Sequence, residues 1–328
     1  ALPIFPASRA GQVVPDVSLY DHARATAALA TALHLYHRDT ETLTIEAVQE
    51  ESSKKLLMIG GDFYGIQKFI FSESGEAGKN RSKILRGRSF GVSLITELAA
   101  CKLCRAMGLP GLSVLLNAAG KFTILGPNTG EAKNGVVEAD REINDWLFRM
   151  NHGECALGIG MVELSLKDLT RGRFIQAWED LNKRMEKKKS QKIDLDTHGG
   201  VIKGYLDGFD NTLERPLCPF CGKRPSSRRV EGSKVVGDVK SACCLCRDHL
   251  YLGTNLVKRK RIAVMKKDAE IKGSGNALLE PIFGEFQVAF IDGGLRDMAR
   301  RGSLLKYWDI SIDGTGTVAK DITARFLS

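Results

Sequence analysis

Two cysteine pairs have the spacing of a metal site. The two Cys-x-x-Cys motifs, with 21 residues between them, are formed by Cys218, Cys221, Cys243 and Cys246. Four thiolates arranged as a tetrahedron suit zinc, and four protein ligands leave no open position for catalysis. We therefore predict a structural zinc ion, against the alternative of buried free thiols or a redox pair. Cys244 offers a different register, and His249 could replace one of the four cysteines.

Two other groups of metal-binding residue types carry a weaker signal. Cys101 and Cys104 repeat the spacing, but they lie in a helical pattern with no second pair nearby, so buried structural cysteines are expected there. His22 stands beside Asp21 without further histidine or aspartate ligands, which is more typical of a packed helix residue.

An acidic residue follows an apolar run near the start of the chain. The stretch LLMIGGDFY places Asp62 after two glycines, at the end of a predicted strand. The N–H groups of a glycine-permissive loop can turn toward an anion, although the same letters fit a tight turn. Two arginines downstream, Arg86 and Arg88 in KILRGRSF, could bind a nucleotide phosphate together with the Tyr64 to Gln67 backbone, or could coat a solvated helix.

Hydrophobic periodicity predicts the elements that would position these residues. The expected order is strand 54–60, helix 79–107, strands 112–117 and 121–126, helix 131–150 and strand 155–165. Three residues separate the two middle strands, which is hairpin spacing. This order is that of a ferredoxin-like fold, so we predict an α+β protein with a cyclase- or polymerase-like palm, a zinc lobe and an N-terminal helical segment.

The tip of the predicted hairpin bears on catalysis. Nucleotidyl cyclases and palm polymerases place a carboxylate after the first strand and further ones on this hairpin, so that two magnesium ions bridge the phosphates. Asp62 meets the first requirement, whereas residues 117–120 read Asn-Ala-Ala-Gly and contain no acid. We therefore expect the palm to lack phosphoryl-transfer activity.

Other segments complete the expected outline. A helix over 15–37 begins at the possible cap Ser18, and the polar stretch 38–52 is typical of a linker. Ser165 and Asp168 predict a capping box for a third helix that ends near Lys189. Later segments, listed by their expected structure, are a loop over 194–212, one or two apolar strands within 258–294, and a short basic helix or loop over 295–308.

Composition sets broad limits. The 328 residues carry a net charge of +9 and a pI near 9.1, which favours contact with a polyanion. No apolar run is long enough for a transmembrane helix and the N-terminus does not resemble a signal peptide, so we expect a cytoplasmic protein. The first residue is alanine, and the chain is expected to be part of a longer one.

Three motifs together resemble one family. GDFYGIQKFIF and SKILRGRSF are similar to two signatures of the large subunit of type III CRISPR effector complexes, and the second is closer to the Csm (III-A) subtype. SLYDHARATAALA resembles the last helix of that subunit's HD domain, and the paired cysteines match its zinc lobe. The resemblance spans residues 15–326. Phe63 and Tyr64 depart from it, because they replace an Ile-Ser pair and remove a small hydroxyl.

The resemblance implies a domain plan. It consists of the end of the HD domain and a linker (1–53), the first palm (54–210), the zinc lobe (211–255), and the remainder of the palm with the start of a linker (256–328). In the family a second palm makes cyclic oligoadenylates from ATP and magnesium, the ATP lies between the palms, and the HD domain is a single-stranded DNA nuclease. We expect no catalytic residue in this chain, since the hairpin acids and the His-Asp pair are missing. The expected nucleotide contacts are Asp62, Tyr64, Gly65, Gln67, Arg86, Arg88 and Ser89.

The leading hypothesis is therefore that the chain is part of an RNA-guided antiviral complex. The chain would contribute half of an ATP site and surfaces for other Csm-type subunits, guide RNA and target RNA, without a membrane. One alternative is a non-catalytic, zinc-containing nucleic-acid-binding module that uses the basic runs 183–192 and 258–267. A second is a stand-alone cyclase that acts as a dimer.

Overall fold

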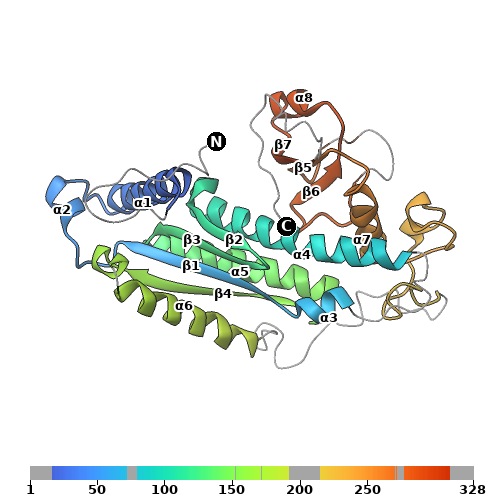
Figure 1. The fold of residues 1–328 in the computed structure, drawn as a ribbon, viewed down its shortest axis with the longest axis horizontal. Coiled ribbons are helices and arrows are strands. Elements are labelled where there is room, and N and C mark those ends of the chain that lie inside the picture. Colours follow the sequence, from blue (N-terminus) through green and yellow to red (C-terminus); the bar gives the residue numbers. More distant parts are fainter. Residues whose placement is uncertain are drawn as a thin grey trace. The chain divides into compact units, whose positions relative to one another are not determined.

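Figure 1 shows the computed structural model of the chain. The structure describes residues 17–71, 80–151, 153–170, 172–191, 215–269, 271 and 277–310. It divides into two compact units, which are described separately. Unit 1 comprises Ala1–Tyr64, Thr96–Asp145 and Cys155–Asp194, and unit 2 comprises Gly65–Ile95, Trp146–Glu154 and Leu195–Ser328. The predicted loop 194–212 lies outside the described residues.

Unit 1 is built on a four-stranded antiparallel sheet. Its strands are β1 (Leu56–Tyr64), β2 (Val114–Ala118), β3 (Lys121–Pro127) and β4 (Ala156–Leu164). The strand order is β2-β3-β1-β4, and the three neighbouring pairs are all antiparallel. The predicted hairpin is confirmed, and its second strand lies directly beside β1. This is the strand order of a ferredoxin-like palm.

Two long helices connect these strands as predicted. Helix α4 (Arg81–Ala106) runs from β1 toward the hairpin, and α5 (Gly130–Asn151) joins the hairpin to β4. The two helices pass close to each other within unit 1, because a Cβ on Gly135 would lie 2.8 Å from the backbone oxygen of Ala106. A short 3-10 helix, η3 (Gly111–Ser113), precedes β2.

One face of the sheet is covered by α1 (Leu19–Asp39) and α6 (Arg173–Lys189). Ala32 of α1 and Leu181 of α6 share one buried cluster with Met58 of β1. Figure 1 shows α6 running along β4. Burial of this apolar face holds the helices on the sheet, since the hydrophobic contribution is about 25 cal/mol per Å² of apolar surface. The predicted first helix and its cap Ser18, which accepts from the N–H of Asp21, are confirmed.

Three predictions in unit 1 need correction. β1 continues through the Gly-Gly-Asp sequence to Tyr64, because both neighbouring strands pair with it there, so Asp62 lies in a strand and not in a loop. The expected linker 38–52 contains α2 (Ile45–Gln49), whose last carbonyls accept from the buried ammonium of Lys55. The capping box at Ser165 is present but starts the 3-10 helix η4 (Leu166–Leu169), and α6 begins separately after Gly172.

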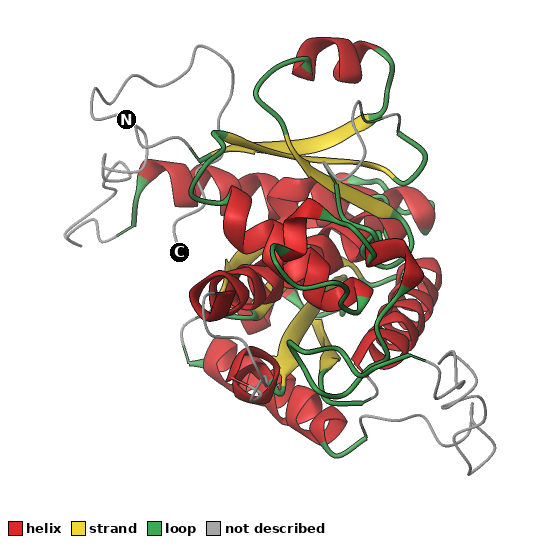
Figure 2. Ribbon diagram, turned by 90° about the vertical axis from the view of Figure 1, so that its right-hand side faces the viewer, coloured by secondary structure: helices red, strands yellow, loops and turns green. Residues whose placement is uncertain are grey.

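Unit 2 contains α3 (Ile66–Phe71), α7 (Cys244–Asn255) and a second sheet. The sheet has the order β6-β5-β7, and its strands are β5 (Arg261–Lys266), β6 (Phe286–Phe290) and β7 (Leu304–Asp309). Helix α8 (Leu295–Arg300) packs beside β7, as Figure 2 shows near the top of its view. We expected residues 256–328 to complete the palm and 295–308 to be helix or loop. Instead the three strands pair with one another, and the second half of 295–308 is β7.

Within unit 2, the first half of α4 crosses α7 at two glycines. A Cβ on Gly87 would lie 1.8 Å from the backbone oxygen of His249, and a Cβ on Gly253 would lie 1.8 Å from that of Lys83. Real Cβ atoms do not approach backbone this closely, so both positions require glycine. The glycine of the LRGRSF sequence is therefore explained by helix packing.

No helix in the described ranges is both long and apolar enough to cross a membrane.

We predict that Gly87→Ala lowers the free energy of unfolding by about 1–3 kcal/mol, the usual cost of overpacking. Gly91→Ala is the matched control on the same helix, since a Cβ there has no neighbour closer than 3.8 Å. Alanine in a helix gains up to about 1 kcal/mol over glycine, so this control should not lose stability. Urea unfolding of both variants measures the difference. Equal stability of the two variants would show that the crossing tolerates a side chain.

Candidate functional site

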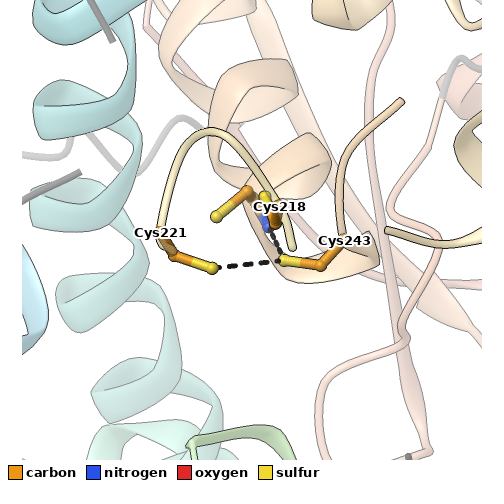
Figure 3. A group of neighbouring side chains, drawn as sticks. Cys218, Cys221 and Cys243 are labelled. Carbon is orange, nitrogen blue, oxygen red and sulfur yellow. Dashed lines mark hydrogen bonds between the residues drawn. The ribbon is translucent and has the colours of Figure 1, made fainter. Parts of the chain in front are cut away.

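The four predicted cysteine ligands come together in unit 2. One ligand atom from each of Cys218, Cys221, Cys243 and Cys246 lies within 4.8 Å of the others, and all four residues are buried. Figure 3 shows three of them, with the sulfur atoms of Cys221 and Cys243 facing each other at 4.0 Å. Cys244 is partly exposed and His249 is buried, but neither belongs to the group.

Local backbone geometry brings the sulfurs together. Cys218 and Cys221 lie in a tight turn, in which the N–H groups of Cys221 and Gly222 donate to the carbonyl of Cys218. Cys243 is the N-cap of α7, and its sulfur accepts from the N–H of Cys246 at 3.4 Å. The second pair is thus fixed by a helix start and the first by a turn, which is how two such pairs present four ligands to one ion.

The thiols cannot all ionise without a cation. Hydrogen bonding with Cys218, Cys243 and Cys246 lowers the pKa of the Cys221 thiol. Hydrogen bonding with Cys218, Cys221 and Cys243 raises the pKa of Cys246, and burial adds to this. Four buried sulfurs at this separation, with backbone N–H groups donating to them, fit a tetrahedral zinc ion. Zinc would hold the turn against the start of α7.

The zinc lobe has a small apolar core around these sulfurs. Phe220, Val230, Val236 and Leu250 are buried in one cluster with the four cysteines, and Ile84 of α4 joins them. The short 3-10 helices η5 (Arg228–Val230) and η6 (Lys234–Val236) supply the two valines. For a lobe with so little regular structure, a bound metal would contribute directly to stability.

A buried ion pair ties α7 to the segment before β6. The guanidinium of Arg247 donates to the Asp248 carboxylate at 2.8 Å, and both side chains are almost fully buried. The N–H groups of Leu279 and Glu280 also donate to this carboxylate. Burial raises the pKa of Asp248 to about 6, while these hydrogen bonds and Arg247 oppose the shift. The carboxylate is therefore charged at neutral pH and holds three partners.

Asp62 has a cation as its partner. It pairs in register with Lys121 of β3, and the ammonium nitrogen lies 3.1 Å from the carboxylate. The hairpin turns at Ala119 and Gly120, both with positive φ. Among the described residues, the only group of three or more metal-ligating side chains is the cysteine cluster, so Asp62 does not belong to a group of that kind.

The remaining predicted nucleotide contacts have structural roles or none assigned. The Tyr64 hydroxyl donates to the carbonyl of Met185 inside unit 1, and burial raises its pKa. Gly65 has φ +82° where β1 ends, and Gln67 of α3 is exposed. These observations do not test nucleotide binding, which stays a prediction for all seven residues.

The two arginines of the RGRSF sequence contact backbone within unit 2. Arg86 donates to the carbonyl of Gly253 at 2.7 Å, and the buried Arg88 donates to that of Ile70 at 3.1 Å. Ser89 is exposed. Asp62 and Tyr64 belong to unit 1, whereas the other five predicted contacts belong to unit 2.

The other cysteine pair and the lone histidine lie on helices. Cys101 and Cys104 are on α4, and Cys104 is buried, as expected for structural residues. His22 lies on α1 but is exposed, so it is not the packed residue that we predicted.

Sequence reasoning missed two side chains at these sites. Lys121 immediately follows the hairpin tip, so hairpin register could have placed it opposite Asp62. Arg224 lies three residues after Cys221, inside the metal-binding turn. This short spacing could have predicted a basic side chain close to the metal ligands.

We predict that the chain binds about one zinc ion and that Cys218→Ser abolishes this, because three thiolates are left. Cys244→Ser is the matched control and should keep the ion, since Cys244 lies outside the cluster. Elemental analysis after dialysis against a weak chelator measures zinc per chain. Equal loss in both variants would contradict the ligand assignment.

We also predict that Asp248→Asn lowers the free energy of unfolding by about 3–5 kcal/mol, because it leaves the buried Arg247 without its counter-ion. Asp292→Asn removes an exposed partner of Arg259 and should cost less than about 1 kcal/mol. Thermal or denaturant unfolding compares the two. A similar small effect for both would mean that the buried pair contributes little.

Comparisons with known proteins agree with this geometry. Residues 55–199 match the family model described as Csm1 subunit domain B. Two relatives carry the name CRISPR system single-strand-specific deoxyribonuclease Cas10/Csm1 (subtype III-A). The one from Thermococcus onnurineus is 29% identical over 282 residues, which cover 85% of this chain and 34% of the relative. The one from Mycobacterium tuberculosis is 25% identical over 293 residues, or 83% and 34%.

Solved structures share the fold. The Csm1-Csm4 subcomplex in the type III-A CRISPR-Csm interference complex gives a TM-score of 0.59 at 24% identity, covering 85% of this chain and 31% of that chain. The Csm1-Csm4 cassette in complex with one ATP gives the same values. The chain spans about one third of the length of the curated relatives it matches. The family model, the relatives and the fold therefore agree in their similarity to the Cas10/Csm1 large subunit of subtype III-A, and they support reading the chain as a fragment of such a subunit.

Proposed function

We propose that the chain forms part of the large subunit of a type III-A CRISPR RNA-guided antiviral complex. In this proposal its palm is a non-catalytic partner that helps to bind ATP, while a second palm outside this sequence makes cyclic oligoadenylates. The zinc lobe and the second sheet serve as scaffold toward other subunits, guide RNA and target RNA. Support comes from the match to the family model and from similar structures described as Csm1-Csm4 cassettes in complex with ATP or cA4.

The observation that carries the non-catalytic role is the Asp62–Lys121 ion pair. Two-metal phosphoryl transfer needs carboxylates that share two magnesium ions about 3.5–4 Å apart. Here the Asp62 carboxylate is paired with an ammonium group at 3.1 Å, and in the described residues it belongs to no group of three or more metal-ligating side chains. A lysine in that position repels a divalent cation, so the palm is suited to hold a nucleotide and not to transform it.

The domain plan is part of the proposal. It keeps an HD-derived helix before residue 54, a palm up to about 210 and a zinc lobe over 211–255. For the segment after 255 we now propose a separate small β-domain, because its three described strands make their own sheet. Magnesium would accompany ATP at the second palm, outside the residues described.

One observation favours a second candidate, a nucleic-acid-binding module. Helix α6 ends in a run of exposed basic residues that includes Lys183, Lys187 and Lys189. A basic stripe of this kind binds phosphate backbones without reading sequence. Under this alternative, ATP would play no part in the function of the chain.

We predict that the chain incubated with ATP and magnesium yields no cyclic or linear oligoadenylate, and that Asp62→Asn leaves this unchanged. Among the described residues Asp62 belongs to no group of three or more metal-ligating side chains, so we expect that its removal takes away no chemistry. Chromatography of the nucleotides, with an active cyclase as assay control, provides the measurement. Turnover that Asp62→Asn abolishes would establish a working cyclase site and overturn the proposal.

Binding experiments separate the two candidates. ATP binding by calorimetry, weakened by Arg86→Ala, supports the nucleotide-holding palm. RNA affinity that falls steeply with salt in the absence of ATP binding supports the nucleic-acid module instead. The salt dependence arises because a protein that neutralises phosphates releases their counterions, and this release is less favourable at high salt.

A further inference from the structure

A pocket of unit 2 lies directly beside the zinc-binding sulfurs. Cys221 and Cys246 line it together with Arg224, His249 and Lys223, and it contains about 280 Å³ of space that is partly open to solvent. The two cysteines are metal ligands, so whatever lines this pocket shapes the surroundings of the ion. Such outer residues usually tune how tightly a metal is held.

Two buried nitrogen atoms in this pocket have no hydrogen-bond partner among the described residues. They are Nε of Arg224 and Nδ1 of His249. Nitrogen atoms of this kind are normally satisfied when buried, so each points to a partner that belongs in the pocket. His249 is almost fully buried, and burial together with the charges of Arg88 and Arg224 lowers its pKa to about 3, which leaves it a neutral ring.

The other charged side chains of the pocket already have partners. Lys223 pairs with Glu154, and Lys68 lies 3.9 Å from the same carboxylate. Arg88 donates to the carbonyl of Ile70. Arg224 is the pocket cation whose buried Nε lacks a partner within the described part of the chain. Its backbone carbonyl accepts from the N–H of Cys218 at 2.7 Å, so the residue is fixed within the metal-binding turn.

The negative charge of the cysteine sulfurs indicates which group the guanidinium of Arg224 faces. A zinc ion with four thiolates keeps two negative charges, and a buried excess of this kind needs compensation. Burial lowers the pKa of the Arg224 guanidinium, but the nearby sulfurs of Cys243, Cys221 and Cys246, together with the carboxylate of Glu154, more than reverse this and raise it. A free anion in the same pocket would face the thiolates and be repelled, so a bound anion is the poorer explanation of the unpaired donors.

We propose that Arg224 is a positioning residue of the zinc site, whose guanidinium lies in the same pocket as Cys221 and Cys246 and neutralises part of the tetrathiolate charge, with His249 closing the same side. The inference rests on the zinc assignment above and is independent of ATP binding. It explains why the partly buried side chain beside the Cys218 to Cys221 turn is an arginine. A neutral polar side chain there would leave the backbone hydrogen bonds of the turn unchanged but would supply no positive charge.

The test is a zinc competition titration on the full 328-residue chain, with a chromophoric chelator. Arg224→Met, which keeps the length and removes the charge, should bind zinc about 10- to 100-fold more weakly than the wild type. Arg224→Lys should recover most of the affinity. Arg228→Met is the matched control, since Arg228 is an exposed residue of the same lobe, and it should bind like the wild type.

Cobalt substitution gives a second readout. The sulfur-to-cobalt absorption bands of Arg224→Met should shift, because thiolates without a nearby cation are better electron donors, and those of Arg228→Met should not. If Arg224→Met does not fold in excess zinc, Arg224→Gln is titrated in its place, with weaker binding again expected. Unchanged affinity and unchanged bands for the neutral variant overturn the proposal. A wild type that binds no zinc overturns the zinc assignment itself, whatever the result with ATP.

Discussion

Four buried sulfur atoms that need a cation organise the lobe between 215 and 255. At separations below 4.8 Å, the thiols cannot all become thiolates unless a metal balances their charge. The lobe has two 3-10 helices and one α-helix over these residues, so its apolar core is small. With so little surface to bury, a metal bound by these sulfurs would couple its binding to the folding of the lobe. The crossing of α4 and α7 and the hydrogen bonds of the buried pair Arg247–Asp248 connect this lobe to the rest of unit 2.

In the palm, the fold and the side chains at the site have to be considered separately. Its strand order, its hairpin and the strand that carries Asp62 are those of a two-metal enzyme, yet the partner of Asp62 is Lys121. The ion pair satisfies the carboxylate with the neighbouring strand, so the sheet is intact without metal. Fold and activity are therefore separate inferences, and only the side chains at the site decide the second.

Local patterns predicted local structure well. The helix cap at Ser18, the hairpin and the set of four cysteines follow from residue spacing and hydrophobic periodicity. The predictions that failed depend on contacts with residues that are distant in the sequence. Two glycines before Asp62 indicate a turn, but pairing with β3 and β4 on both sides keeps them in a strand. The glycine at 87 is required by a carbonyl far later in the chain, at residue 249, which no local pattern reveals.

The residues of the RGRSF sequence differ in how far packing within unit 2 already occupies them. Gly87 is committed to the helix crossing, and the buried Arg88 is committed to the carbonyl of Ile70. Arg86 differs because it is partly exposed, and the carbonyl of Gly253 accepts from only one nitrogen of its guanidinium, which has five N–H donors. Ser89 is exposed. A phosphate contact made by this motif would therefore come from Arg86 and Ser89, with the other two residues acting only by holding the helix in place.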